Sequence, residues 1–400
     1  MRMDPVTLPP QFSGDDYHDR LYGLFRGFLA NTPVFRNDEG NTYICRYADC
    51  AHLLSAPEFV RQPAEGSGTF TRSDTPSRLE VMIGHWMIFM DPPRHDQMRD
   101  AFKTAFNARA LKALEPRIRE QACQLLAAWQ GQSRVEAVQS FASLYPARVI
   151  ARMLGIPLAD VPRFLQWGNE LTSAMDTATE DSLRRGEGVA GELADYVGHL
   201  IARRSELPSD CLINTVSALV GERLSAEEFL HGCAFLLWAG QETTKALLAN
   251  GLWLLSRHAD QREKLQRQPA LIADAIEEML RYETPVQKTS RWTTRAARFG
   301  DHEVPAGVMV TALLGAAHRD PACYVQPDRF DITRRGNRHL AFGTGIHHCL
   351  GAVLARTEAR IAFEELLPRL RRLEYASHAW RPYSSFRSLD YLNLAVELDC

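Results

Sequence analysis

The spacing of apolar residues limits this chain to a largely helical fold. Through most of its 400 residues, apolar side chains recur at steps of three and four. That spacing places them on one face of an α-helix. The segments that show it are 16–30, 107–130, 138–154, 157–178, 188–205, 225–256, 259–266, 270–282 and 351–369. Strand patterns are few and short, at 42–45, 308–310 and 392–396. The sequence therefore predicts a mainly α protein with small β-sheets.

Nothing in the sequence divides the chain into separate units. It contains no Gly/Ser-rich linker, no charge run and no repeat of fixed period, so we predict one domain over residues 1–400. One stretch, 319–351, lacks a regular pattern and is rich in Pro, Arg, Asp and Gly. An irregular run of that length in a compact domain is usually functional.

Charge and cysteine usage narrow the location and the partners. The net charge of −3 creates no long-range field that would gather nucleic acid or anionic lipid. Residues 1–10 are interrupted by proline and charge, unlike a signal peptide or anchor, and the most apolar stretch, 229–240, is too short to span a bilayer. The eight cysteines show no CxxC pairs, which fits reduced thiols. We expect a cytoplasmic protein that binds neither nucleic acid nor membranes.

The strongest local signal is a glycine-punctuated loop that delivers one cysteine into a helix, with the sequence Phe342-Gly343-Thr344-Gly345-Ile346-His347-His348-Cys349-Leu350-Gly351. Glycines allow positive φ and close backbone approach, so the loop can lie against a flat ligand and point N–H groups at a sulfur. A thiolate there would lie near the positive end of the following helix, which favours the ionised form that a metal needs. Two other interpretations stay open at this point. A single buried cysteine is more often inert core, and the adjacent histidines could suggest zinc, although no second Cys/His cluster completes a tetrahedral set.

The loop resembles the haem-binding signature of cytochromes P450, F-G-x-G-x-H-x-C-x-G, at every fixed position. The resemblance implies a P450 fold of the soluble bacterial type, with haem b (iron protoporphyrin IX) between a long distal helix and the cysteine loop. It implies that Cys349 is the axial thiolate ligand of the iron and that His347 donates to a haem propionate. Phe342, Gly343 and Gly351 belong to the same cofactor-binding signature.

A second segment, Ala239-Gly240-Gln241-Glu242-Thr243-Thr244, lies within the predicted helix 225–256. A glycine there lowers the cost of a distortion, and a threonine hydroxyl can bond a carbonyl one turn back and bend the helix. Alone, the hexapeptide could be a polar patch. It resembles the family's A-G-x-[DE]-T-[TS] segment across the distal face of haem. That implies that Ala239 contacts the haem and that Glu242 and Thr243 manage protons during oxygen activation.

Candidate propionate donors come from two further places. The segment 91–99 predicts a proline-initiated helix start and resembles the family's D-P-P-x-H-x-x-x-R, which implies that His95 and Arg99 contact a propionate. Arg291 lies where the family has another propionate-binding arginine. Several donors around two carboxylates make chemical sense, because a buried propionate without partners is costly. Each residue singly could be a solvated surface charge.

Glu278 and Arg281 lie three residues apart on one helix face and can form an ion pair. A surface pair is the ordinary interpretation of any E-x-x-R. The resemblance places such a pair inside the fold and implies that an arginine of Pro327-Asp328-Arg329-Phe330 completes it. We expect Glu278, Arg281 and Arg329 to act as a structural brace that shapes the cysteine loop.

The resemblance also implies an apolar substrate pocket with few polar anchors. Its expected lining is Trp86, Phe89, Leu236, Ala239, Val286, Gln287, Lys288 and Leu389. Lys288 is unusual in this set. If it points inward it would need an anionic substrate group, and if outward it is ordinary surface.

The reaction implied is that of a haem-thiolate monooxygenase that inserts one atom of O2 into a small organic molecule by hydroxylation, epoxidation or dealkylation. No flavin, dinucleotide or Fe–S motif extends the chain, so electrons must come from a ferredoxin or flavodoxin with its NAD(P)H-dependent reductase. An expected basic docking patch comprises Arg94, Lys103, Arg109, Lys112, Arg356 and Arg360. The alternatives are a peroxygenase or isomerase, which retention of Glu242 and Thr243 disfavours, and a non-catalytic haem sensor.

Overall fold

The computed structural model describes residues 16–37, 40–62 and 75–399, and its fold is mainly helical, as predicted. The α-helices are α1 Tyr17–Asn31, α2 Tyr47–Ser55, α3 Arg78–Gly84, α4 Arg94–Lys103, α5 Ala108–Ala127, α6 Leu144–Leu154, α7 Val161–Asp176, α8 Glu180–Ala202, α9 Leu212–Ser217, α10 Ala226–Arg257, α11 Ala259–Arg267, α12 Ile272–Tyr282, α13 Leu314–Ala317 and α14 Ala352–Leu366. Short helical turns are η2 Met87–Phe89, η3 Thr104–Phe106, η4 Val138–Ala142 (a π-turn), η5 Leu158–Asp160, η6 Arg204–Glu206, η7 Pro269–Leu271, η8 Gly345–His347 and η9 Leu367–Arg369.

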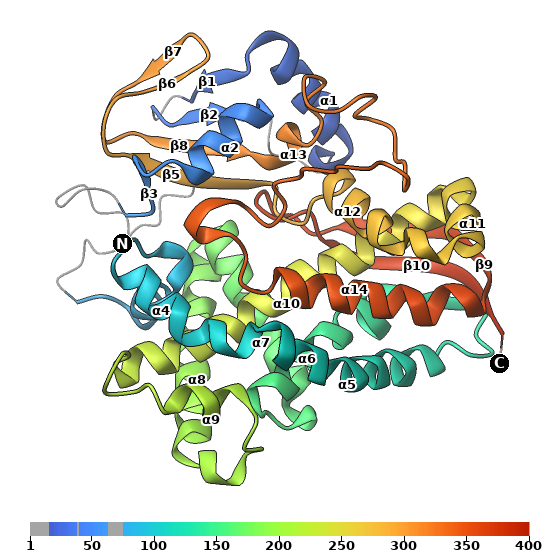
Figure 1. The fold of residues 1–400 in the computed structure, drawn as a ribbon, viewed down its shortest axis with the longest axis horizontal. Helices are drawn as coiled ribbons and strands as arrows, with labels where there is room; N and C mark the ends of the chain where they lie inside the picture. Colours follow the sequence, from blue (N-terminus) through green and yellow to red (C-terminus); the bar gives the residue numbers. More distant parts are fainter. Residues whose placement is uncertain (1–15, 38–39, 63–74, 400) are drawn as a thin grey trace.

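The strands form three small sheets. They are β1 Val34–Arg36, β2 Thr42–Ile44, β3 Phe59–Val60, β4 Arg134–Glu136, β5 Lys288–Thr293, β6 Ala297–Phe299, β7 His302–Val304, β8 Met309–Leu313, β9 Leu370–Trp380 and β10 Leu389–Leu398. The largest sheet has the order β1-β2-β8-β5-β3, in which β2 and β8 are parallel and the other pairs antiparallel. The others are β4-β10-β9 and the hairpin β6-β7. In Figure 1 the five-stranded sheet lies with α1, α2 and α13 at the upper left, and the long helices fill the lower part.

Most of the expected elements are present, and the two longest omitted strands share a cause. The strand patterns at 42–45, 308–310 and 392–396 correspond to β2, β8 and β10. The two longest strands that the sequence missed are β9, which pairs with β10, and β5, which pairs with β8; the short strands β1, β3, β4, β6 and β7 were not predicted either. Both of these longer strands carry many partly exposed polar residues, so their strand character comes from the partner's backbone. The irregular stretch 319–351 contains only turns and η8, as predicted.

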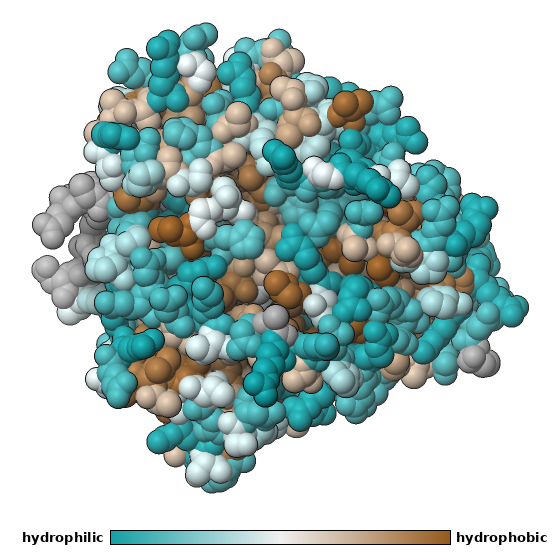
Figure 2. Space-filling view, viewed as in Figure 1, coloured by the Kyte–Doolittle hydropathy of each residue, from teal (hydrophilic) through white to brown (hydrophobic). Residues whose placement is uncertain are grey.

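The surface is largely polar. Hydrophilic residues cover most of the face drawn in Figure 2, with small hydrophobic areas between them. None of the helices in the described part of the chain combines the length and hydropathy that a bilayer span needs. The largest cluster of buried apolar residues extends from Leu79 to Val396. That residues 1–400 form a single domain stays a prediction.

Helix α10 is the central element of this core. Ser225 and Glu228 cap its first turn through reciprocal side-chain to backbone hydrogen bonds. Over residues 231–252 every position is buried except Ala239, Gly240 and Thr243. The helix therefore packs on all sides but one short facet, which belongs to the segment predicted to cross the haem.

Gly251 lets α10 approach its neighbours closely. A Cβ there would lie 2.8 Å from Phe363 Cζ and 2.9 Å from Met279 Sδ. We expect Gly251→Ala to lower the free energy of unfolding by about 1–3 kcal/mol, because the added methyl overpacks the interface. The matched control is Gly23→Ala in α1, where a Cβ meets nothing within 4 Å. This control should raise the free energy of unfolding by about 0.5–1 kcal/mol, because alanine favours the helix over glycine. Thermal unfolding midpoints that move in the same direction for both variants would contradict this.

Candidate functional site

The cysteine loop has the backbone geometry that its glycines allow. Gly343 and Gly345 have φ of +66° and +69°, in the left-handed region. A Cβ on Gly345 would come within 2.7 Å of the Leu54 carbonyl oxygen, so the loop lies directly against the end of α2. The Cys349 N–H donates to the Phe342 carbonyl at 2.8 Å, which closes the loop before Gly351 begins α14.

The thiol of Cys349 is accessible, yet protein atoms surround it closely enough to perturb its ionisation. Burial raises the pKa of Cys349, and the Gly351 N–H, Arg99 and Arg356 offset only part of that increase. The N–H at the helix end does favour the thiolate, as expected, but in the protein alone desolvation outweighs this contribution. A bound metal cation would supply the remaining stabilisation of the thiolate.

Two histidines converge beside the loop. The rings of His95 and His347 lie with centroids 4.3 Å apart. The Nδ1 of His95 lies 2.8 Å from Asp96 Oδ1, while the Nε2 atoms of both histidines are buried and have no partner among the described residues. A buried nitrogen without a hydrogen-bond partner is destabilising, so a polar ligand that bonds these atoms would be favoured.

Three arginines lie around these histidines. Burial, together with the nearby charges of Arg61, Arg291, His95 and Arg99, lowers the pKa of His347 to about 2. Burial also lowers the pKa of Arg291 to about 10 and that of Arg61 well below its usual value. A buried cluster of positively charged side chains is suited to binding an anion. The two propionates of haem are such anions.

Arg61 is the functional candidate that the sequence analysis missed. It follows the two-residue strand β3, and its guanidinium donates to the Ser290 carbonyl at 3.1 Å. The Asp91 carboxylate accepts from the Arg61 backbone N–H at 2.9 Å, which fixes the position of the residue. A single arginine after a short strand carries no sequence signal, so only the tertiary structure identifies it.

The distal segment of α10 has the predicted threonine geometry. The Thr243 hydroxyl donates to the Ala239 carbonyl, one turn back, at 3.2 Å. Thr243 and Ala239 share the partly accessible facet of the helix, whereas Glu242 is 6% exposed and points elsewhere.

Glu242 forms a buried ion pair with Lys245 at 2.5 Å. Burial would raise the pKa of Glu242, but Lys245 and Arg381 more than offset this and hold it below its usual value. Both residues line a small cavity of about 20 Å³. Its other lining residues are Gln139, Ser143, Leu165, Gly168, Asn169, Trp238 and Gln241. The acid of the predicted pair therefore faces a small cavity that several polar side chains line, and it stays ionised at neutral pH.

Two of the three predicted brace residues, Glu278 and Arg281, form the expected ion pair. Glu278 and Arg281 are both 0% exposed and form a bidentate pair at 2.7 and 2.8 Å. Arg281 also donates to the carbonyls of His318 and Pro327, both at 2.8 Å. The pair thus connects α12 to the irregular stretch 319–351.

The prediction that Arg329 completes the brace is wrong, because its side chain does not reach Glu278. It is exposed and donates to the Gln326 side chain at 3.4 Å, and only its backbone carbonyl accepts from Arg281. Arg334 takes the expected place, with its Nε 3.2 Å from the Glu278 carboxylate. The side-chain amide of Asn337 donates to the same carboxylate at 2.9 Å. A turn follows Phe330, in which the Arg334 N–H donates to the Asp331 carbonyl. As a result Arg334, and not Arg329, points toward Glu278.

Comparison with known proteins agrees with this geometry. A family model described as cytochrome P450 matches residues 194–378. The vitamin D(3) 25-hydroxylase of Pseudonocardia autotrophica is 37% identical over 88% of this chain and 89% of its own. The mycinamicin IV hydroxylase/epoxidase of Micromonospora griseorubida is 38% identical over 90% and 91%. The chain belongs to the cytochrome P450 family. The crystal structure of P450BioI in complex with hexadec-9Z-enoic acid ligated acyl carrier protein superposes with a TM-score of 0.90, at 32% identity over 96% of this chain and 99% of that one.

Membership makes this P450 a haem-dependent monooxygenase of the bacterial type. Two observations bear on the alternatives left open for Cys349. The residue is not inert core, since its surface is accessible, and in the described part of the chain no group of metal-binding side chains includes it with His347 or His348.

The expected pocket residues of this P450 separate into two groups. Phe89, Val286 and Lys288 are partly accessible. The structure contradicts the pocket prediction for three other residues, because their side chains pack in the interior with almost no accessible surface to offer a ligand. They are Trp86, Gln287 and Leu389, at 0%, 2% and 0% exposure. Trp86 stacks on Trp238 at 4.8 Å, and Gln287 donates to the Thr284 carbonyl. Leu236, at 5% exposure, is also largely packed.

Lys288 is neither free surface nor an unpaired inward charge. Its ammonium donates to the Ser384 hydroxyl at 2.8 Å. Burial lowers the pKa of Lys288 to about 8, and the nearby Asp176 opposes that shift. The lysine therefore already has polar partners within the protein.

The corrected brace can be tested with two matched arginines. Arg334→Ala should lower the free energy of unfolding by about 3–5 kcal/mol and reduce haem retention, because it leaves the buried Glu278 carboxylate with less compensation. Arg329→Ala should change stability by no more than about 0.5 kcal/mol, since its side chain is exposed. Thermal unfolding and haem content measure both. Equal losses in the two variants would contradict the assignment.

Proposed function

We propose that this P450 uses haem b to insert one atom of O2 into a small, largely apolar organic substrate by hydroxylation, epoxidation or dealkylation. The observation that carries the proposal is the pairing of an accessible, loop-held Cys349 thiol with the unsatisfied Nε2 atoms of His95 and His347. Together these groups fit the iron and the propionates of one haem.

The cofactor-binding roles follow from this arrangement. Cys349 would ligate the iron, while Phe342, Gly343, Gly351 and Ala239 would lie against the macrocycle. The propionates would accept from His95, Arg99, Arg291 and His347, with Arg61 as a further donor. When bound, the haem supplies the reductive activation of O2, which an axial thiolate favours by pushing electron density toward O–O cleavage.

Two residues of α10 would manage protons. Glu242 is ionised and borders a small cavity that several polar side chains line, so it can take up a proton from that side. Thr243 donates its own proton to Ala239, which leaves its oxygen lone pairs able to accept from a water and hold it at the distal face. Retention of this pair favours monooxygenation over the peroxygenase or isomerase alternative. No observation favours a non-catalytic sensor.

The substrate would be largely uncharged. Lys288 already bonds Ser384 and lies near Asp176, so it does not call for an anionic group on the ligand. Phe89 and Val286 offer accessible apolar surface for contact. The names of two relatives, a 25-hydroxylase and a hydroxylase/epoxidase, support these reaction types.

Electrons would come from a ferredoxin or flavodoxin with its NAD(P)H-dependent reductase, in the cytoplasm. Lys103, Arg109 and Lys112 are exposed and make no ion pair within the described residues, so they remain available to an acidic carrier. The other three members of the expected patch are already paired: Arg94 with Glu228, Arg356 with Glu277, and Arg360 with Glu115 and Glu364. Ile346 and Val353, which flank Cys349 in sequence, add exposed apolar contact area at 49% and 55% exposure.

Thiolate ligation has a direct spectroscopic test. Reduced protein with carbon monoxide should show the strongly red-shifted Soret band that thiolate-ligated haem gives, and Cys349→Ser should lose it. Turnover should fall with it, because a hydroxyl donates less electron density to iron than a thiolate does. A wild-type spectrum without that band would disprove the central assignment.

The ion pair of Glu242 predicts a specific pH dependence. Lys245→Met removes the cation that lowers the pKa of Glu242, so burial should raise that pKa above its usual value. The carboxylate then becomes protonated as pH falls, and we expect turnover to drop roughly tenfold near pH 6 and to recover in alkali. Lys245→Arg keeps the charge and is the control. Superimposable pH profiles of wild type and Lys245→Met would contradict the role of the pair.

The docking surface predicts a kinetic effect at low salt. Replacing Lys103, Arg109 and Lys112 by glutamate should slow reduction by an acidic ferredoxin by about 10-fold or more, because steering by opposite charges raises association rates. Arg204→Glu in η6 is the control for adding an exposed acid elsewhere. Stopped-flow reduction at increasing ionic strength measures the effect, which should shrink as salt screens it. Equal slowing by the control would argue against this surface.

A further inference from the structure

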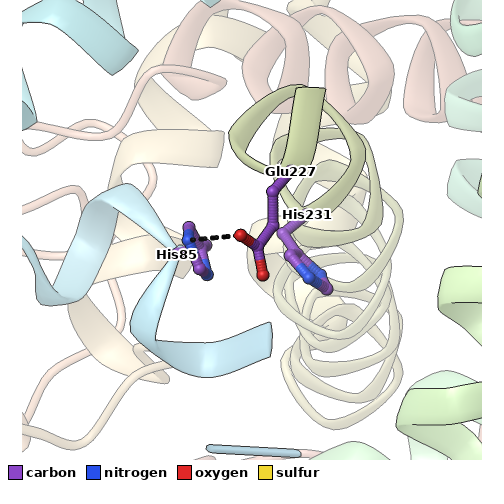
Figure 3. Close-up of side chains that lie close together, drawn as sticks. All are labelled: His85, Glu227 and His231. Carbon is purple, nitrogen blue, oxygen red and sulfur yellow. Dashed lines mark ion pairs between the residues drawn. The ribbon is translucent and has the colours of Figure 1, made fainter. Parts of the chain in front are cut away.

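Three side chains of metal-binding type gather outside the site described above. His85 follows α3 directly, and Glu227 and His231 lie one turn apart near the start of α10. Each offers one ligand atom, and these atoms all lie within 4.8 Å of one another. Figure 3 shows the Glu227 carboxylate between the two imidazoles, with His85 approaching from the α3 side. The haem-binding and proton-managing residues do not include any of the three.

His85 is oriented as a metal-ligating histidine is. Its Nδ1 lies 2.8 Å from the Val81 carbonyl, which can only accept, so Nδ1 carries the proton. That leaves the Nε2 lone pair free, 3.8 Å from Glu227 Oε2. A backbone carbonyl that holds the remote N–H of a ligating imidazole fixes both its tautomer and its direction.

His231 supplies an independent sign of a missing ligand. It is only 7% exposed, and its buried Nδ1 has no hydrogen-bond partner among the described residues. Its ring lies 5.2 Å from that of His85, which places both imidazoles at the same small volume.

We propose that His85, Glu227 and His231 form a site for a divalent transition-metal ion such as Zn²⁺. Two imidazoles and one carboxylate are a common ligand set for such ions, with a further position open to water. Ligand atoms around tetrahedral zinc lie roughly 3.4 Å apart, so the farthest pair must close by somewhat over an ångström. The partly exposed side chains of His85 and Glu227, at 28% and 58%, leave room for that adjustment. The Glu227 charge offsets the unfavourable positive end of α10.

The consequence of binding would be mechanical. The ion would connect α3 to the first turns of α10. Trp86 follows α3 and stacks on Trp238 of α10, so the connection would hold this segment against the helix that carries Thr243. An ion that binds only the folded arrangement also stabilises it by mass action.

The test uses haem-loaded protein that has been stripped with a chelator and then titrated with zinc chloride by calorimetry. We expect one zinc per chain at this site, and at least about tenfold weaker binding in His85→Ala and in Glu227→Gln. His199→Ala is the matched control, because His199 also bonds the carbonyl four residues back, through Nδ1 at 2.7 Å to Asp195. The control should bind zinc as the wild type does.

A second readout protects the test against misfolded variants. Each variant is first checked for the reduced carbon monoxide spectrum of the wild type, and Glu227→Gln keeps the shape of an exposed side chain. Zinc should raise the thermal midpoint of wild type and His199→Ala but not of Glu227→Gln. The proposal is overturned if wild type shows no saturable one-to-one binding, or if His85→Ala and Glu227→Gln bind zinc as tightly as His199→Ala.

Discussion

The buried carboxylate of Glu278 is the interaction on which the arrangement of this P450 depends. Residues 319–351 contain almost no regular structure, so their backbone groups cannot satisfy one another in a helix or ladder. Glu278 instead accepts from Arg281, Arg334, Asn337 and the backbone N–H of Asp331. Such a fully hydrogen-bonded charge is tolerated in the interior, whereas a partly satisfied one would be strongly destabilising.

This network extends toward the cysteine loop. Arg281 holds the His318 carbonyl, and the Nε2 of His318 accepts from the Leu340 N–H, two residues before Phe342. Burial keeps the pKa of His318 well below its usual value, so its Nε2 stays unprotonated and able to accept. The position of Cys349 is therefore set by polar contacts that begin on α12, more than 60 residues earlier in the chain.

Beside the cysteine loop, in contrast, the polar groups are not satisfied within the protein. There the protein gathers Arg61, Arg99, Arg291 and two histidines without enough carboxylates to neutralise them, and it leaves buried ring nitrogens unpaired. A scaffold satisfies its own polar groups, but a binding site leaves them for the ligand. Both carboxylate oxygens of Glu278 accept hydrogen bonds, whereas the Nε2 of His347 has no partner among the described residues. This contrast distinguishes the structural network from the proposed cofactor site.

The sequence by itself determined the family and the helical character, and it located the cysteine loop, the Thr243 hydrogen bond and the Glu278–Arg281 pair. Those features are local: a helix face brings residues three or four apart together, and glycine permits a loop conformation whatever surrounds it. Only the tertiary structure decided that Arg334 and not Arg329 completes the brace, that Arg61 joins the cationic cluster, and that Lys288 bonds Ser384. Each of these depends on how segments far apart in the chain meet and on which side chain an irregular turn points inward. Burial decided the rest, because desolvation outweighs the helix end at Cys349 in a way that no local pattern encodes.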